Sequence, residues 1–176
     1  MKTMAVALLA LALPAQTPMQ PAKDLFMHSA RVPGVEIRFV DYHWQPALFE
    51  AMEKGSSTIP EAKRNWVIAR VILNDRPLTL GSSRVAVGNY GLVLWPNLDG
   101  KGMALEMRRI DMREVYPDVN AIAPAPRGET VFKGPVTFET GSPLAERFDI
   151  ATAADAGKVT LTVSYGDRRL VVTFVR

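Results

Sequence analysis

The stretch VTLTVSYGDRRLVVTF, residues 159–174, decides the fold class of this chain. Apolar and polar side chains alternate on both sides of Gly166-Asp167, which is the pattern of a strand buried on one face. A glycine followed by an aspartate suits a two-residue type II′ turn. We therefore predict two antiparallel strands that are joined by a tight hairpin at Gly166-Asp167.

Segments of the same kind recur along the chain, and turn residues separate them at intervals of about 8–12 residues. The predicted strands comprise residues 35–40, 65–73, 83–87, 90–95, 103–107, 130–138 and 144–150. The clearest turn is NLDGKG at 97–102, whose Asp99-Gly100 pair suits a hairpin.

In one segment, the apolar residues recur with the period of a helix and not of a strand. QPALFEAMEK, residues 45–54, places Leu48, Phe49 and Met52 on one face of a helix and carries a proline near its start. The sequence therefore predicts an all-β fold, namely an antiparallel β-sandwich or jelly roll with one short helix near the N-terminus.

The first fifteen residues, MKTMAVALLALALPA, have the form of an export signal, because Lys2 precedes an apolar run that ends in Pro14-Ala15. A helix over residues 4–15 would span only about 18 Å of the ~30 Å bilayer core, so we expect cleavage and no stable membrane insertion. The expected organisation is a signal peptide over 1–15, a flexible leader over 16–30 and a single β-sandwich domain over 31–176. We expect the protein to be periplasmic or secreted.

The composition excludes several classes of function. The chain has no cysteine, and it carries 21 basic and 18 acidic residues with a formal net charge of +3. Without cysteine there is no disulfide framework, thiol catalysis or cysteine-bound metal. The charge is too balanced to predict nucleic acid or an anionic membrane surface as a partner. We expect no cofactor, and we expect the partner to be a small ligand or another envelope protein.

Residues 88–96 read GNYGLVLWP, a G-x-Y-x-L-x-x-x-P pattern formed by Gly88, Tyr90, Leu92 and Pro96. This pattern resembles the core of an uncharacterised family of exported bacterial β-sandwich proteins, a domain of unknown function. The resemblance covers residues 66–176 and implies an all-β fold and a location in the envelope, without an established activity. The chain departs from the family upstream of the motif, where a polar cluster of the family is largely missing. The four motif residues are expected to be structural.

Asp41, Tyr42 and His43 bring a carboxylate and an imidazole two residues apart, on one face if the strand at 35–40 continues. With the nearby His28, they form the one carboxylate–histidine grouping in the sequence. Asp41 and His43 are therefore the candidate catalytic residues, as general acid and base. The alternative is a strand end whose polar side chains hydrogen-bond a loop. No metal site is expected, because the chain has only two histidines and no His-x-x-x-His spacing.

Tyr42 and Trp44 are the candidate ligand-binding residues, because aromatic rings can stack on a sugar or on a partner's side chain. Trp44 stands at a strand end beside Gln45-Pro46, and it is expected to be exposed. Trp66 and Trp95 lie in apolar segments and are expected in the core.

Four carboxylates are close in sequence to three arginines. The acids are Glu106, Asp111, Glu114 and Asp118, and the arginines are Arg108, Arg109 and Arg113. Two acids on facing strands could form a glycosidase pair. The interleaved arginines favour a solvated face of mutual ion pairs instead.

These observations predict an exported, non-enzymatic β-sandwich that binds a ligand or a partner in the cell envelope. The alternative is a carboxylate-dependent hydrolase that acts on glycans or other extracytoplasmic substrates, with its acids in 41–43 or 106–118.

Overall fold

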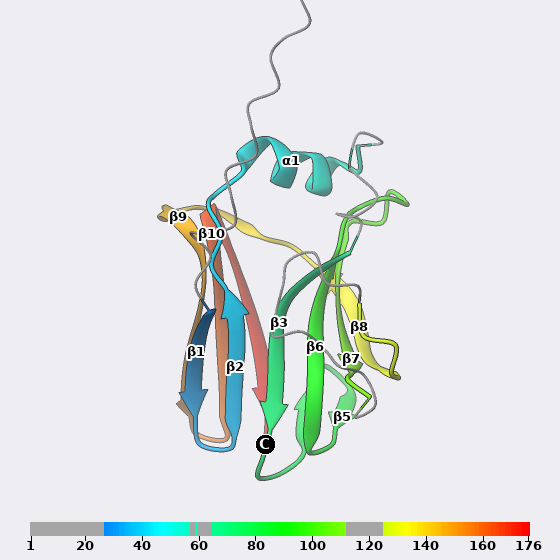
Figure 1. The fold of residues 1–176 in the computed structure, drawn as a ribbon, viewed down its shortest axis with the longest axis vertical. Coiled ribbons are helices and arrows are strands. Elements are labelled where there is room, and N and C mark those ends of the chain that lie inside the picture. Colours follow the sequence, from blue (N-terminus) through cyan, green and yellow to red (C-terminus); the bar gives the residue numbers. More distant parts are fainter. Residues whose placement is uncertain (1–26, 57–58, 60–64, 112–124) are drawn as a thin grey trace, which may run out of the picture.

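The computed structural model describes residues 27–56, 59, 65–111 and 125–176, which form two antiparallel sheets packed face to face (Figure 1). The larger sheet has six strands in the order β1 (Met27–Val32), β2 (Val35–Val40), β3 (Trp66–Leu73), β6 (Gly88–Trp95), β7 (Met103–Arg109) and β8 (Thr130–Val136). The smaller sheet has four strands in the order β5 (Ser83–Val85), β4 (Leu78–Leu80), β10 (Lys158–Val175) and β9 (Glu139–Asp155). The predicted all-β antiparallel sandwich is confirmed.

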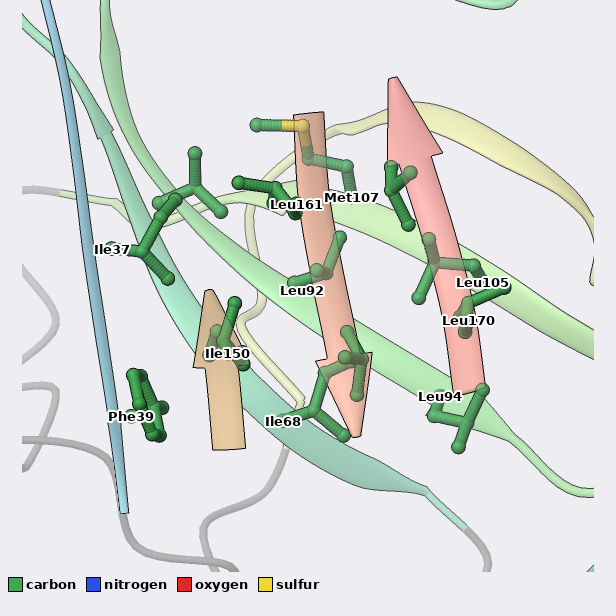
Figure 2. Close-up of a cluster of buried hydrophobic side chains, with 14 of the residues drawn as sticks. Ile37, Phe39, Ile68, Leu92, Leu94, Leu105, Met107, Ile150, Leu161 and Leu170 are labelled. Carbon is green, nitrogen blue, oxygen red and sulfur yellow. The ribbon is translucent and has the colours of Figure 1, made fainter. Parts of the chain in front are cut away.

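The core lies between the two sheets. In β2, Val35, Ile37 and Phe39 are buried, and the residues between them point to the outer face, because successive side chains of a strand alternate between its two sides. Figure 2 shows the inner side chains of the larger sheet beside Ile150 of β9 and Leu161 of β10. Full burial of such an aliphatic side chain contributes about 1.5–3 kcal/mol, so these rows account for much of the stability of the fold.

The hairpin predicted at Gly166-Asp167 is wrong. Residues 158–175 form one continuous strand, β10, and its register against β9 shifts on both sides of Gly166. Gly166 has φ +62°, the conformation of a glycine in a β-bulge. The turn is instead Ala156-Gly157, where both residues have positive φ, as a two-residue hairpin requires. Glycine-aspartate suits a bulge as well as a turn, so local composition does not separate the two.

The turn predicted at residues 97–102 is confirmed. NLDGKG joins β6 to β7 as a hairpin, and Gly100 has φ +74°. The leader expected over 16–30 needs a correction at its end, because β1 starts at Met27 and pairs with β2 from Met27↔Val40 to Val32↔Val35. The expected signal peptide and residues 16–26 lie outside the described residues.

The predicted helix is confirmed as α1 (Pro46–Lys54), between β2 and β3 rather than at the very N-terminus. It lies across one end of the sandwich (Figure 1) and buries Phe49 and Met52. Its carboxyl end is held from both sheets, because the Met52 carbonyl accepts from the amide of Asn97 and the Glu53 carboxylate binds Arg168 of β10 at 3.1 Å. Across the described residues, no helix has the length and apolarity needed to cross a membrane.

Candidate functional site

The candidate segment Asp41–Trp44 joins the two sheets. It follows β2 of the larger sheet and then pairs with β9 of the smaller one through an isolated bridge between His43 and Arg147. The Phe148 amide donates to the Tyr42 carbonyl at 2.9 Å, and the Trp44 amide donates to the Glu146 carbonyl at 2.8 Å. The chain therefore leaves one sheet and is hydrogen-bonded to the other within four residues.

Asp41 is 7% exposed, and its carboxylate is held by two basic groups. Nε of Arg147 donates to Oδ2 at 2.6 Å, and Nε2 of His28 on β1 lies 3.3 Å from the same oxygen. The His28 ring is also stacked on Phe39 of β2, with ring centroids 5.5 Å apart. Asp41 thus binds the edge strand of one sheet to the edge strand of the other.

His43 is engaged by the same arginine. Nη1 of Arg147 lies 3.0 Å from Nε2 of His43, and a guanidinium can only donate, so Nε2 accepts and the proton of a neutral ring sits on Nδ1. Arg147 therefore occupies the lone pair that a general base or a metal ligand would use. The structure brings Asp41 and His43 together, as the spacing predicted. Both side chains contact Arg147, which forms an ion pair with Asp41 and donates a hydrogen bond to His43.

The candidate ligand-binding aromatics belong to a packed cluster of rings below α1. Tyr42 lies 5.1 Å from Trp66 and 5.1 Å from Phe148, centroid to centroid, and burial raises its pKa well above the ordinary value. Trp44 meets Tyr165 edge-on at 4.7 Å. The hydroxyl of Tyr165 donates to the His43 carbonyl at 2.8 Å, and burial raises its pKa to about 12. This cluster fills the end of the sandwich.

The tryptophan assignments are only partly right. Trp66 is in the core, as predicted, at 8% exposure. Trp44, expected to be exposed, is partly buried and packed against the core. Trp95, expected in the core, is half-buried on the outer face of the larger sheet, where Nζ of Lys133 lies 5.0 Å above its ring.

Glu106 does not lie on a solvated face, so that expectation is wrong for this residue. Glu106 is 4% exposed, and its carboxylate accepts from Nε1 of Trp95 at 2.5 Å and from the hydroxyl of Thr130. Nε of Arg108 is 3.3 Å away. Its two hydrogen-bond donors come from the strands on either side of β7, Trp95 from β6 and Thr130 from β8. Asp111 is exposed, whereas Glu114 and Asp118 lie outside the described residues.

The four residues of the family-like pattern lie in or directly after β6. Tyr90, Leu92 and Pro96 are buried, and Gly88 is half-buried. The Tyr90 hydroxyl donates to the carbonyl of Ala86 at 2.8 Å, which ties the start of β6 to the preceding loop. These contacts are packing contacts within the fold.

Sequence reasoning missed Arg147, Lys133 and the Trp95–Glu106 contact. Arg147 lies 106 residues from Asp41, and nothing in its local sequence marks it as a partner. In the part of the chain that the structure describes, no three His, Cys, Asp or Glu side chains are grouped so that they could hold a metal ion.

Comparison of the chain with protein-family models, with curated proteins and with solved structures finds no match. The resemblance at residues 88–96 therefore stays a prediction.

Proposed function

We propose that this chain is an exported, non-enzymatic β-sandwich domain that binds a partner or ligand in the cell envelope. The observation that carries the proposal is the arrangement around Arg147, whose guanidinium contacts both Asp41 and His43 at 2.6 and 3.0 Å. A general base needs a free lone pair that faces the substrate. Here the guanidinium holds both groups and serves to join two sheets.

The hydrolase alternative has little support from the described acids. It needs two carboxylates on either side of a substrate bond. Asp41 is bound to Arg147 and His28, and Glu106 is bound to Trp95, Thr130 and Arg108. Each of these buried acids serves its own network of protein groups.

Export is supported by the form of residues 1–15, with Lys2 followed by an apolar run and Pro14-Ala15. The test is fractionation of bacterial cells that produce the full chain with a C-terminal tag. We expect a shortened chain in the envelope fractions, and we expect Leu8→Arg to keep the chain full-length inside the cell. A full-length chain in the cytoplasm without the substitution would overturn the location.

The non-enzymatic part is tested by incubating the wild-type protein and Asp41→Asn with a panel of envelope glycans and measuring released reducing ends. We expect no release by either protein. Release by the wild type that Asp41→Asn abolishes, while Glu146→Gln on the exposed edge of β9 retains it, would establish the hydrolase instead.

A further inference from the structure

Two edge strands end the sheets on the same side of the sandwich. β1 ends the larger sheet and β9 ends the smaller one, and both lie on the left of Figure 1. Residues 149–155 of β9 pair with β10 on one side, and no strand in the described part of the chain pairs with their other side. We call residues 149–155 the β9 edge. An edge of this kind presents N–H and C=O groups that another strand can bind.

The direction of these backbone groups follows from a neighbouring hydrogen bond. The amide of Phe148 donates to the Tyr42 carbonyl at 2.9 Å, so it points away from β10. Backbone groups of successive residues in a strand point to opposite sides, and the register of the β9 edge against β10 is unbroken. The N–H and C=O groups of Ile150, Thr152 and Ala154 therefore also point away from β10.

The chain itself already pairs with β9 just before this edge. His43 forms an antiparallel bridge with Arg147, and the Trp44 amide donates to the Glu146 carbonyl at 2.8 Å. On the other side of His43 the chain runs back into β2 of the larger sheet, so this pairing stops before the β9 edge begins. This side of β9 therefore accepts an antiparallel strand, and the segment around His43 uses only its first positions.

The inner face of β1 lacks the cover that the inner face of β2 has. Ala30 and Val32 of β1 lie opposite Ile37 and Val35 of β2, so all four side chains share the inner face. Ile37 and Val35 are 0% and 4% exposed, whereas Ala30 and Val32 are only half-buried. The smaller sheet ends at β9 and leaves β1 partly uncovered. A strand added to the β9 edge would lie beneath β1 and bury these two side chains further.

The side chains of the β9 edge favour one kind of occupant. Asp149 and Asp155 are exposed at its two ends, and the exposed Ala151 and Ala153 lie between them on the same face. A second copy that paired antiparallel along the whole edge would place its Asp155 opposite Asp149, and like charges in such pairs are destabilising. A strand with basic residues at these two positions would be favoured instead. Lys158 of β10 lies opposite Asp155, so we expect the stronger preference at Asp149.

We infer that the β9 edge binds an extended segment of a partner protein as an added antiparallel strand. The segment turns apolar side chains toward β1 and basic side chains toward Asp149 and Asp155. In strand addition, main-chain hydrogen bonds supply affinity and alternate side chains supply specificity. The inference rests on the proposed function of binding a partner, and it deepens that function by naming the surface and the class of partner.

The probe is a fluorescein-labelled heptapeptide with lysine at both ends, valine at the even positions and threonine at the other two. Fluorescence anisotropy measures its binding to the full chain at low salt. We expect binding that weakens as salt is added, and that weakens about tenfold when both lysines are replaced by glutamate. Equal binding of the lysine and glutamate peptides would overturn the basic partner.

Methylated peptides test the backbone pairing on the wild-type protein. In the antiparallel register, the amides of the valines face the β9 edge and those of the threonines face away from it. Methylating the valine amides should therefore abolish binding, whereas methylating the threonine amides should change it less than about twofold. Equal effects of the two methylations would overturn strand addition.

Variants of the protein place the site. Ala154→Pro removes an N–H that points away from β10, a position where an edge strand tolerates proline, and it should weaken peptide binding about tenfold. Asp149→Asn should weaken binding about threefold, whereas Asp99→Asn, at an exposed acid of the turn 97–102, should change it less than about twofold. Unchanged binding by Ala154→Pro would overturn the site. The methylated peptides need no variant, so they decide the inference even if the proline substitution disturbs folding.

Sedimentation velocity of the wild-type protein distinguishes a partner segment from a second copy. We expect a monomer, and a dimer that Ala154→Pro dissociates would overturn the partner and place a second copy on the β9 edge. The two proposals also fail separately. A chain found in the envelope that binds none of the peptides overturns this inference and leaves the location standing. A chain found in the cytoplasm overturns the location, and the peptides still decide whether the β9 edge binds a strand.

Discussion

The indole of Trp44 lies directly against the backbone of Gly166, so that a Cβ at position 166 would overlap the ring. Gly166 marks the bulge in β10, and Trp44 belongs to the segment that crosses from one sheet to the other. One glycine therefore allows both the bend of the longest strand and the closure of the sandwich end.

The first prediction concerns this contact. Gly166→Ala should lower the free energy of unfolding by about 3 kcal/mol, because a non-glycine residue at φ +62° is strained and the added methyl group overpacks the ring. Gly141→Ala is the matched control, since Gly141 has φ +87° and nothing lies within 4 Å of its added Cβ. It should cost only about 1 kcal/mol. Urea denaturation measures both, and equal losses would contradict the role of Trp44.

The second prediction concerns the contact between the sheets at Asp41. Arg147→Met and Asp41→Asn should each lower the unfolding free energy by about 2 kcal/mol, because each removes one side of an ion pair whose carboxylate is buried. The double variant should lose clearly less than the sum of the two. Chemical denaturation of all four proteins gives the coupling energy. The exposed Lys101–Asp99 pair is the control and should couple by under about 0.5 kcal/mol. Strict additivity of Arg147→Met and Asp41→Asn would refute a stabilising ion pair between the two residues.

The third prediction is a loss of stability in alkali. Burial raises the pKa of Tyr165 to about 12 from its usual 10.0, so the neutral phenol is favoured in the folded state. A raised pKa gives stability that is fully present below about pH 10 and is lost as the pH rises through about 12, an effect of about 2–3 kcal/mol. Burial also raises the pKa of Tyr42, in the same direction.

Thermal melting as a function of pH, together with tyrosinate absorbance, tests this alkaline effect. Tyr165→Phe should be less stable at neutral pH, because it loses the hydrogen bond to the His43 carbonyl, and its stability should fall less steeply between pH 10 and 12. A Tyr165 that ionises at its usual pKa in the folded protein would contradict the prediction.

The fourth prediction concerns Glu106. Glu106→Ala leaves Nε1 of Trp95 and the hydroxyl of Thr130 without their acceptor, and it should lower the unfolding free energy by about 2–3 kcal/mol. Glu106→Gln keeps an acceptor oxygen and should lose about 1 kcal/mol. Trp95 fluorescence should shift in the alanine variant. Glu146→Ala, at an exposed carboxylate, should change stability by under about 0.5 kcal/mol, and a similar result at Glu106 would refute the network.

Much of the fold could be predicted because the signals are local. The alternation in β2, the turn at 97–102 and the helix at 46–54 each depend on residues within a few positions of one another. The bulge at Gly166 could not, because its conformation depends on β9 and on Trp44. β1 was not predicted because its inward residues are His28, Ala30 and Val32, which give only a weak apolar alternation, and because its pairing with β2 shows only in the register.

Only part of the candidate site could be predicted from the sequence. Asp41 and His43 are two residues apart, so their grouping follows from strand geometry. The group that holds them, Arg147, comes from the opposite sheet, 106 residues from Asp41. The spacing of residues along a strand relates only near neighbours in the sequence, so it could not predict this partner.

By itself, the sequence determined the class of fold, since a period of two residues is a property of each strand alone. It also determined the absence of cysteine and the balance of charge. The tertiary structure alone decided that Trp95 lies on the outer face of the larger sheet while Trp44 packs against the core, and that Arg38, Arg70 and Arg108 lie in register across that sheet. The physical reason is that cross-strand neighbours come from segments far apart in the sequence. Which side chains share a face is therefore decided only by the register of the sheet.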